Sequence, residues 1–250
     1  MAKDRETKST REKAAAARAE QVAKEKRRER TVRIIGAIGV VVVVVLIIGL
    51  AVVVPRLSGD SSADGVAPWG VPVGDAPETA PLLELWEDFQ CPACGSLEEL
   101  NGAGIQSLGT DGTVRLVWRP TAFLDNNLGN TSSAAAINAW GCAIDAGKTV
   151  EYHDAIFANQ PTSEGEGFSR DLLVGLAEQV GITGVPLEQF NDCLTSNRYL
   201  GWAANSTQAF YDANVEGTPR GFLNGTPLDG AQLADQATLE KLVQEAAAAQ

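Results

Sequence analysis

Methionine, histidine and cysteine are all scarce in this chain. Its 250 residues include one methionine, Met1, and one histidine, His153. The lack of internal methionines removes easily oxidised thioethers, which suits an oxidising compartment. The four cysteines comprise one close pair, Cys91 and Cys94, and two isolated residues. Because a structural zinc site needs four ligands and no second close pair is present, the sequence argues against zinc, and we expect no metal.

Charged and polar side chains are missing from residues 34–54, a run of 21 residues. A helix of this length crosses a bilayer core of about 30 Å. Residues 1–33 contain 12 basic and 6 acidic side chains, and basic residues beside a span favour a cytoplasmic tail. We therefore expect a single-pass transmembrane helix at 34–54, with the rest of the chain extracytoplasmic. A cleaved signal peptide is the alternative, but the run exceeds the usual signal core of about 7–15 residues.

Basic residues are few after this run. Residues 55–250 contain 8 basic and 26 acidic side chains, a net charge of −18, which is unsuited to binding nucleic acid. Residues 55–77 are rich in Gly, Pro, Ser and Asp, and they predict an extended linker. The remaining residues, 78–250, are numerous enough for one globular domain.

The close cysteine pair lies between a strand pattern and a helix pattern. Residues 82–89 are largely apolar, and the helix pattern begins after Cys91. A helix N-terminus has unpaired N–H groups and a partial positive charge, which favour a thiolate over a thiol. We therefore expect Cys91 to be the nucleophile and the more shielded Cys94 to be the resolving thiol. Pro92 suits the first helical turn because it lacks an N–H, and Ala93 adds no charge.

The pattern of the remaining chain predicts the order β-α-β, several helices, β-turn-β, α. A second strand is expected at 113–118, where apolar and polar residues alternate. Residues 121–212 are mainly helical in pattern, with one helix at 132–146. A late strand begins at Phe222 and turns at residues 224–225, an Asn-Gly pair.

This order resembles that of the DsbA-like branch of the thioredoxin superfamily, in particular its membrane-anchored actinobacterial forms. The resemblance covers residues 75–248 and is most specific at residues 88–95 (DFQCPACG) and 217–219 (GTP). It implies an α/β thioredoxin fold with an inserted helical domain at about 121–212, preceded by the transmembrane helix. It also implies that Pro219 is a cis-proline facing the cysteine pair, so that the backbone of Thr218 can pair with a substrate strand.

Two further features follow from the resemblance. Related actinobacterial forms carry a second disulfide, which here implies a bridge between Cys142 and Cys193. Such a bridge closes a loop of about 51 residues and contributes on the order of 4 kcal/mol. A relay of electrons between this bridge and the close pair is the alternative.

The family's buried carboxylate has no counterpart at the usual place. Six residues before the first cysteine, where many members carry a proton acceptor, this chain has Leu85. Asp88 and Glu84 are the candidates for a proton relay, and strand alternation turns Glu84 to the opposite face from Leu85. The alternative is that Asp88 and Glu84 are ordinary acidic residues, either at the surface or in a supporting position near the site. For His153 we expect a packed or surface position.

The resemblance implies an extracytoplasmic thiol:disulfide oxidoreductase that oxidises or exchanges disulfides in secreted proteins. Its partners would be unfolded or reduced secreted chains and a membrane reoxidase, either DsbB or a vitamin K epoxide reductase homologue, and it would need no cofactor. The strongest oxidants of the family have a histidine between their cysteines, and its absence here implies a less extreme potential. The alternatives are a disulfide reductase or isomerase, and a non-catalytic membrane-tethered binding module in which Cys91 and Cys94 form a structural bridge.

Overall fold

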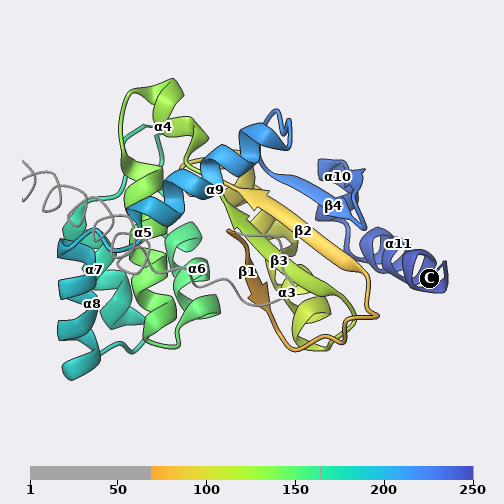
Figure 1. The fold of residues 1–250 in the computed structure, drawn as a ribbon, viewed down its shortest axis with the longest axis horizontal. Helices are drawn as coiled ribbons and strands as arrows, with labels where there is room; N and C mark the ends of the chain where they lie inside the picture. Colours follow the sequence, from red (N-terminus) through yellow and green to blue (C-terminus); the bar gives the residue numbers. More distant parts are fainter. Residues whose placement is uncertain (1–68, 164, 250) are drawn as a thin grey trace, which may run out of the picture. The chain divides into compact units, whose positions relative to one another are not determined.

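A five-stranded sheet organises the computed structural model, which describes residues 69–163 and 165–249 (Figure 1). The strand order is β1-β3-β2-β4-β5. The strands are β1 (Val71–Val73), β2 (Leu82–Glu87), β3 (Arg115–Pro120), β4 (Arg220–Leu223) and β5 (Thr226–Leu228). Strands β2 and β3 are parallel, and the other neighbouring pairs are antiparallel. The sheet is therefore assembled from an early β-α-β unit and a late β-hairpin.

The alternation of side chains along β2 divides the core between the two faces of the sheet. Leu83 and Leu85 are fully buried in the main hydrophobic core. Trp86 faces the other side, where its ring packs edge-on against Phe210 with centroids 5.6 Å apart. Glu87 continues the series of Leu83 and Leu85, so this acid also belongs to the main-core face.

The helix that follows β2 contains a wide turn. It runs through α2 (Pro92–Leu97), a π-helical segment η1 (Glu98–Gly102) and α3 (Ala103–Thr110). Leu97, Ile105 and Leu108 of this helix are buried in the main core. The wide turn changes which side chains of the helix face inward, and segments of this kind are frequent at functional sites.

Six helices between β3 and β4 confirm the predicted helical insertion. They are α4 (Phe123–Leu128), α5 (Ser132–Asp145), α6 (Thr149–Ala158), α7 (Arg170–Gln179), α8 (Val185–Thr195) and α9 (Leu200–Asp212). Figure 1 shows α5 to α8 gathered beside the sheet, whereas α9 returns to it. The chain closes with α10 (Gly230–Ala234) and α11 (Gln236–Ala248). The expected α/β fold with an inserted helical domain is thus confirmed.

Strand β1 corrects one predicted boundary. It lies within residues 55–77, which the sequence assigns to a linker, and it pairs antiparallel with β3. Three residues are too short for a recognisable strand period, and only pairing with β3 reveals this strand. No helix in the described ranges is long and apolar enough to cross a bilayer. The span predicted at 34–54 lies outside those ranges.

Candidate redox site

Cys91 occupies the junction between β2 and the following helix. Its backbone is extended, with φ −75° and ψ 116°, and its carbonyl accepts hydrogen bonds from the N–H groups of Cys94 and Gly95 at 3.1 and 3.2 Å. Pro92 is at the first helical turn, as expected, and Pro92 and Ala93 are both exposed. Both cysteines are thiols; the Cys91 residue is 7% exposed and Cys94 is completely buried. The first cysteine therefore keeps slight access to solvent, whereas the second has none.

The Thr218-Pro219 segment lies against this junction. The peptide bond between these residues is cis, and the Cys91 thiol donates to the Thr218 carbonyl at 3.3 Å. Antiparallel pairing of β2 with β4 explains the contact, because Trp86 near the end of β2 pairs with Arg220 at the start of β4. Residues just after β2 consequently meet residues just before β4.

The surroundings of Cys91 favour its thiolate. A hydrogen bond from the Cys94 thiol lowers the pKa of Cys91 to about 6, although burial opposes this shift. The Thr218 hydroxyl and the N–H groups of Cys94 and Ala93 lower this pKa further. Hydrogen bonds to a thiolate stabilise it in proportion to their number and alignment. The largest effect on the pKa of Cys91 comes from the second thiol, and the N–H groups at the start of α2 add to it.

Cys94 has the opposite character. Burial raises the pKa of Cys94 well above its ordinary value, and its hydrogen bond to Cys91 and the carboxylate of Glu87 raise it further. A buried thiol of this kind stays protonated at neutral pH. The two sulfurs therefore differ in both exposure and acidity.

Asp88, one of the two candidates for a proton relay, is fully buried beside the inserted helices. Its carboxylate accepts from the N–H groups of Gln90 and Leu124, at 2.9 and 3.1 Å, and from the Ser133 hydroxyl. Burial raises the pKa of Asp88 to about 7, although the hydrogen bonds from Ser133 and Gln90 lower it. Asp88 thus ties the loop before Cys91 to helices α4 and α5.

Glu84, the other relay candidate, lies on the sheet face opposite Leu85, as strand alternation predicts. It forms an ion pair with Arg119, whose guanidinium stacks over the Trp86 ring at 5.2 Å from its centroid. No contact in the described part of the chain joins Glu84 to either sulfur. The relay role of Asp88 or Glu84 stays a prediction.

Two glutamines that sequence reasoning missed hold the loop before the helix. The Gln160 amide donates to the carbonyls of Phe89 and Cys91 at 2.8 and 2.9 Å. The Gln90 amide donates to Asp125 and Ser133 at 2.8 Å each. These bonds connect residues up to 71 positions apart, and no local pattern in the sequence signals them.

The sequence reasoning also missed a buried cluster of Glu87, Glu98 and His153. His153 is 1% exposed, so it occupies the packed one of the two positions expected for it. Burial opposes a charge on His153, but the carboxylates of Asp154 and Glu87 outweigh burial and raise its pKa to about 9. Burial and the neighbouring Glu87 raise the pKa of Glu98 to about 8. The alternation Leu83, Leu85, Glu87 is the sequence signal for the first member of this cluster.

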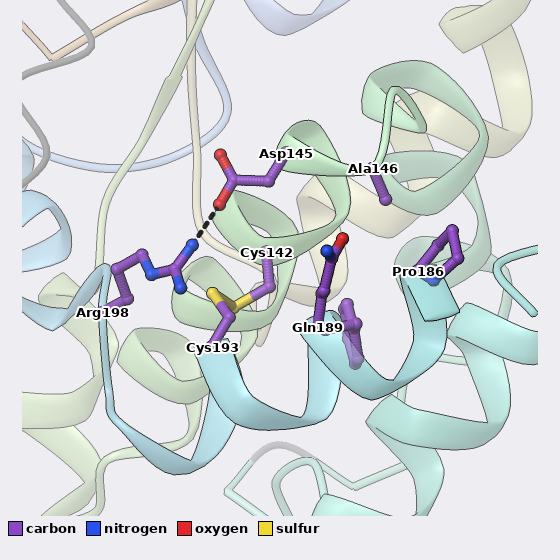
Figure 2. Close-up of a pocket in the computed structure, with 8 residues that line it drawn as sticks. Cys142, Asp145, Ala146, Pro186, Gln189, Cys193 and Arg198 are labelled. Atoms are coloured by element: carbon purple, nitrogen blue, oxygen red, sulfur yellow. Dashed lines mark hydrogen bonds and ion pairs between the residues drawn. A yellow bond between two sulfur atoms is a disulfide. The ribbon is translucent and has the colours of Figure 1, made fainter. Parts of the chain in front are cut away.

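Cys142 and Cys193 form a disulfide with Cα atoms 5.8 Å apart, between α5 and α8 (Figure 2). One side of the bridge lines a cleft of about 420 Å³, close to an ion pair between Asp145 and Arg198. Neither Cys91 nor Cys94 lines this cleft. The bridge therefore joins two helices of the insertion.

Comparisons with known proteins point to one family. A family model described as thioredoxin matches residues 72–245. MdbA of Actinomyces oris, a thiol-disulfide oxidoreductase, is 24% identical over 71% of this chain and 88% of its own, with a TM-score of 0.61. The oxidised DsbA of Mycobacterium tuberculosis is 25% identical over 71% of this chain and 92% of its own, with a TM-score of 0.58.

A third solved structure has the same fold. It is the reduced form of DsbG, a disulfide bond oxidoreductase from Mycobacterium tuberculosis. It is 25% identical over 78% of this chain and 96% of its own chain, with a TM-score of 0.55. A comparison with curated proteins gave no match.

Proposed function

Because the chain belongs to the thioredoxin family, we propose that it is a DsbA-type protein thiol:disulfide oxidoreductase with Cys91 and Cys94 as its redox centre. The observation that carries this proposal is the asymmetry of the two sulfurs. Cys91 is near the surface with a pKa of about 6, and Cys94 behind it is fully buried with a raised pKa. A nucleophile and a shielded resolving thiol are the two groups that disulfide exchange requires.

The reaction starts from the oxidised Cys91–Cys94 bridge. A substrate thiolate attacks the Cys91 sulfur, forms a mixed disulfide and releases Cys94, which takes up a proton. The second substrate thiolate then attacks the substrate sulfur of the mixed disulfide and releases Cys91 as a thiolate. Two electrons pass from the substrate dithiol to the cysteine pair. Stabilisation of the Cys91 thiolate favours the reduced pair and drives the oxidation of the substrate.

The backbone before Pro219 provides a place for the substrate. The Thr218 carbonyl is 3.3 Å from the attacked sulfur, at the start of β4. An extended peptide that pairs with this backbone holds its own cysteine beside Cys91 by β-strand addition. β-Strand addition recognises the backbone of the substrate and therefore accepts many sequences. Such binding suits unfolded or reduced secreted chains as substrates.

The proposal places the catalytic domain outside the cytoplasm. The apolar run at 34–54 and the basic residues before it support a single-pass anchor in the cell membrane with a cytoplasmic N-terminus. The disulfide between Cys142 and Cys193 suits an oxidising compartment. A membrane reoxidase, DsbB or a vitamin K epoxide reductase homologue, would restore the Cys91–Cys94 bridge after each turnover.

Oxidative refolding of a reduced protein with several cysteines, together with insulin reduction, tests the proposal. The oxidised full-length chain should accelerate refolding, and Cys91→Ala should abolish the effect. Cys94→Ala should accumulate a mixed disulfide with insulin, because the Cys91 thiolate displaces one sulfur of an insulin disulfide and no Cys94 thiol is present to release the product. If Cys91→Ala matches the parent chain in both assays, the proposed function is wrong and the binding-module alternative gains support.

A reductase or isomerase is the second candidate, because Pro92-Ala93 brings no charge to stabilise the thiolate further. Equilibration with glutathione separates the two directions. A potential above about −180 mV supports an oxidase, whereas a value near −270 mV, that of thioredoxin, supports a reductase.

A further inference from the structure

The buried cluster beneath the redox helix offers three metal-ligating side chains. One ligand atom each from Glu87, Glu98 and His153 lies within 4.8 Å of the other two. We propose that this cluster binds one divalent cation of the zinc class. The inference concerns a binding site of this chain and does not depend on the proposed redox function.

Two carboxylate oxygens in the cluster lack a partner. Oε1 of Glu87 and Oε1 of Glu98 are buried and have no hydrogen bond among the described residues. The Glu87 side chain is only 5% exposed. A buried carboxylate oxygen without a partner is costly, although Oε2 of Glu87 contacts His153, and two carboxylates at one place repel each other. A divalent cation between them balances both negative charges, and a neutral imidazole then completes a neutral site.

His153 is held as a metal-ligating histidine usually is. Its Nε2 lies 3.3 Å from Oε2 of Glu87, on the side of the cluster, and its Nδ1 lies 3.3 Å from Oδ1 of Asp154. The Gln106 amide donates to the same Asp154 oxygen at 2.7 Å. In metal sites, a carboxylate on the second ring nitrogen fixes the tautomer and turns the other nitrogen to the metal.

Packing restricts the orientation of these side chains further. The Trp118 ring stacks on His153 with centroids 3.8 Å apart and planes 15° apart. Glu98 begins the π-helical segment, and a Cβ at Gly102 would clash with its carboxylate. The glycine therefore leaves the space into which the Glu98 side chain folds.

One imidazole and two carboxylates are donors that zinc accepts, with a fourth position for water. Calcium and magnesium are less suited, because they need more oxygen ligands than the cluster offers. Tetrahedral zinc places its ligand atoms about 3.4 Å apart, so the cluster must contract when the ion binds, and Glu98 is its half-buried member. The Asp154 side chain is 47% exposed, which places this side of the cluster at the surface and gives the cation a route in.

Titration of the oxidised full-length chain in detergent tests the site without interference from thiolates, because both cysteine pairs are then disulfides. Zinc binding is measured by calorimetry, and cobalt binding by visible absorption. We expect one equivalent of zinc with micromolar or tighter affinity. The cobalt spectrum should show d–d bands without the near-ultraviolet band of sulfur ligation.

Three variants locate the ion. Glu98→Gln should weaken binding by at least 100-fold, because it removes a ligand while keeping the shape. Asp154→Asn should weaken binding by about 10- to 100-fold, since it removes only the support of His153. Glu99→Gln alters the exposed neighbour of Glu98 and should leave binding unchanged. Circular dichroism melting of each variant checks that it folds.

Two results would overturn the proposal. The first is an absence of zinc and cobalt binding at 100 µM to the folded parent chain. In that case the two carboxyl groups share a proton, and Glu98→Gln should raise the melting temperature of the metal-free chain. The second is binding that is equally tight in Glu98→Gln and in Asp154→Asn, which would place the ion elsewhere.

Discussion

The Cys91 sulfur lies 3.3 Å from the Thr218 carbonyl oxygen, although 127 positions separate the two residues. Pairing of β2 with β4 brings them together, because the end of one strand meets the start of the other. The proposed nucleophile and the backbone proposed to pair with a substrate thus meet at one junction between β2 and β4.

The pH dependence of alkylation should report the Cys91 thiolate. Its pKa of about 6 is below the ordinary value of 9.0, so the thiolate predominates above pH 6. The rate of iodoacetamide labelling of the reduced chain should reach half its plateau near pH 6 and fall about tenfold for each pH unit below. Because the pKa of Cys91 is lower in the folded chain than in the unfolded chain, ionisation of Cys91 stabilises the reduced fold. This stabilisation is complete above pH 9 and is lost as the pH falls through 6. Cys91→Ala is the control, and labelling of the parent with a midpoint near 9 would contradict the geometry.

The Thr218 hydroxyl should tune the acidity of Cys91. This hydroxyl is buried and has no hydrogen bond in the described ranges, so it is free to donate to a Cys91 thiolate, and it lowers the pKa of Cys91. Thr218→Val keeps the branched shape and the backbone carbonyl but removes this donor. The labelling midpoint should move upward, and the pair should become a weaker oxidant because its thiolate is less stabilised. Thr226→Val, an exposed change on β5, is the control. An unchanged midpoint in Thr218→Val would exclude the hydroxyl as a cause.

Gln160 should stabilise the loop that carries Cys91. Gln160→Ala removes two hydrogen bonds, to the carbonyls of Phe89 and Cys91. The free energy of unfolding should fall by roughly 1–3 kcal/mol, and disulfide exchange should slow because the loop loosens. Urea denaturation and insulin reduction measure the two effects. Gln208→Ala provides a matched control, since its amide bonds only to Asp212 on the exposed side of α9. Equal losses in both variants would refute a specific role for Gln160.

The disulfide between Cys142 and Cys193 should stabilise the fold without taking part in redox turnover. Its closed loop spans 51 positions, and removing it with Cys142→Ala/Cys193→Ala should lower the free energy of unfolding by about 4 kcal/mol. Redox turnover below the unfolding transition should be retained, because neither Cys91 nor Cys94 takes part in this bridge. Loss of turnover in a folded double variant would instead favour an electron relay between the two pairs.

Much of the fold was predictable because its patterns are local. The apolar run at 82–89 predicts β2, and the Asn224-Gly225 turn predicts the late hairpin, with φ of 48° and 78° at these two residues. Ser169 directly precedes α7 and caps it by accepting a hydrogen bond from the Leu172 N–H, a local contact between near neighbours in the sequence. The three residues of β1 escaped notice because so short a strand has no measurable period.

The sequence by itself determined the candidate redox pair, the order of the main elements after β1 and the place of the helical insertion, since spacing and periodicity are properties of neighbouring residues. Only the tertiary structure decided which groups surround the sulfurs. Gln160 and His153 reach the region from the helical insertion through helix packing, and Glu87 is the acid whose charge raises the pKa of the buried Cys94 thiol. Hydrogen bonds and charge interactions act through space, so their partners are fixed only when the chain has folded.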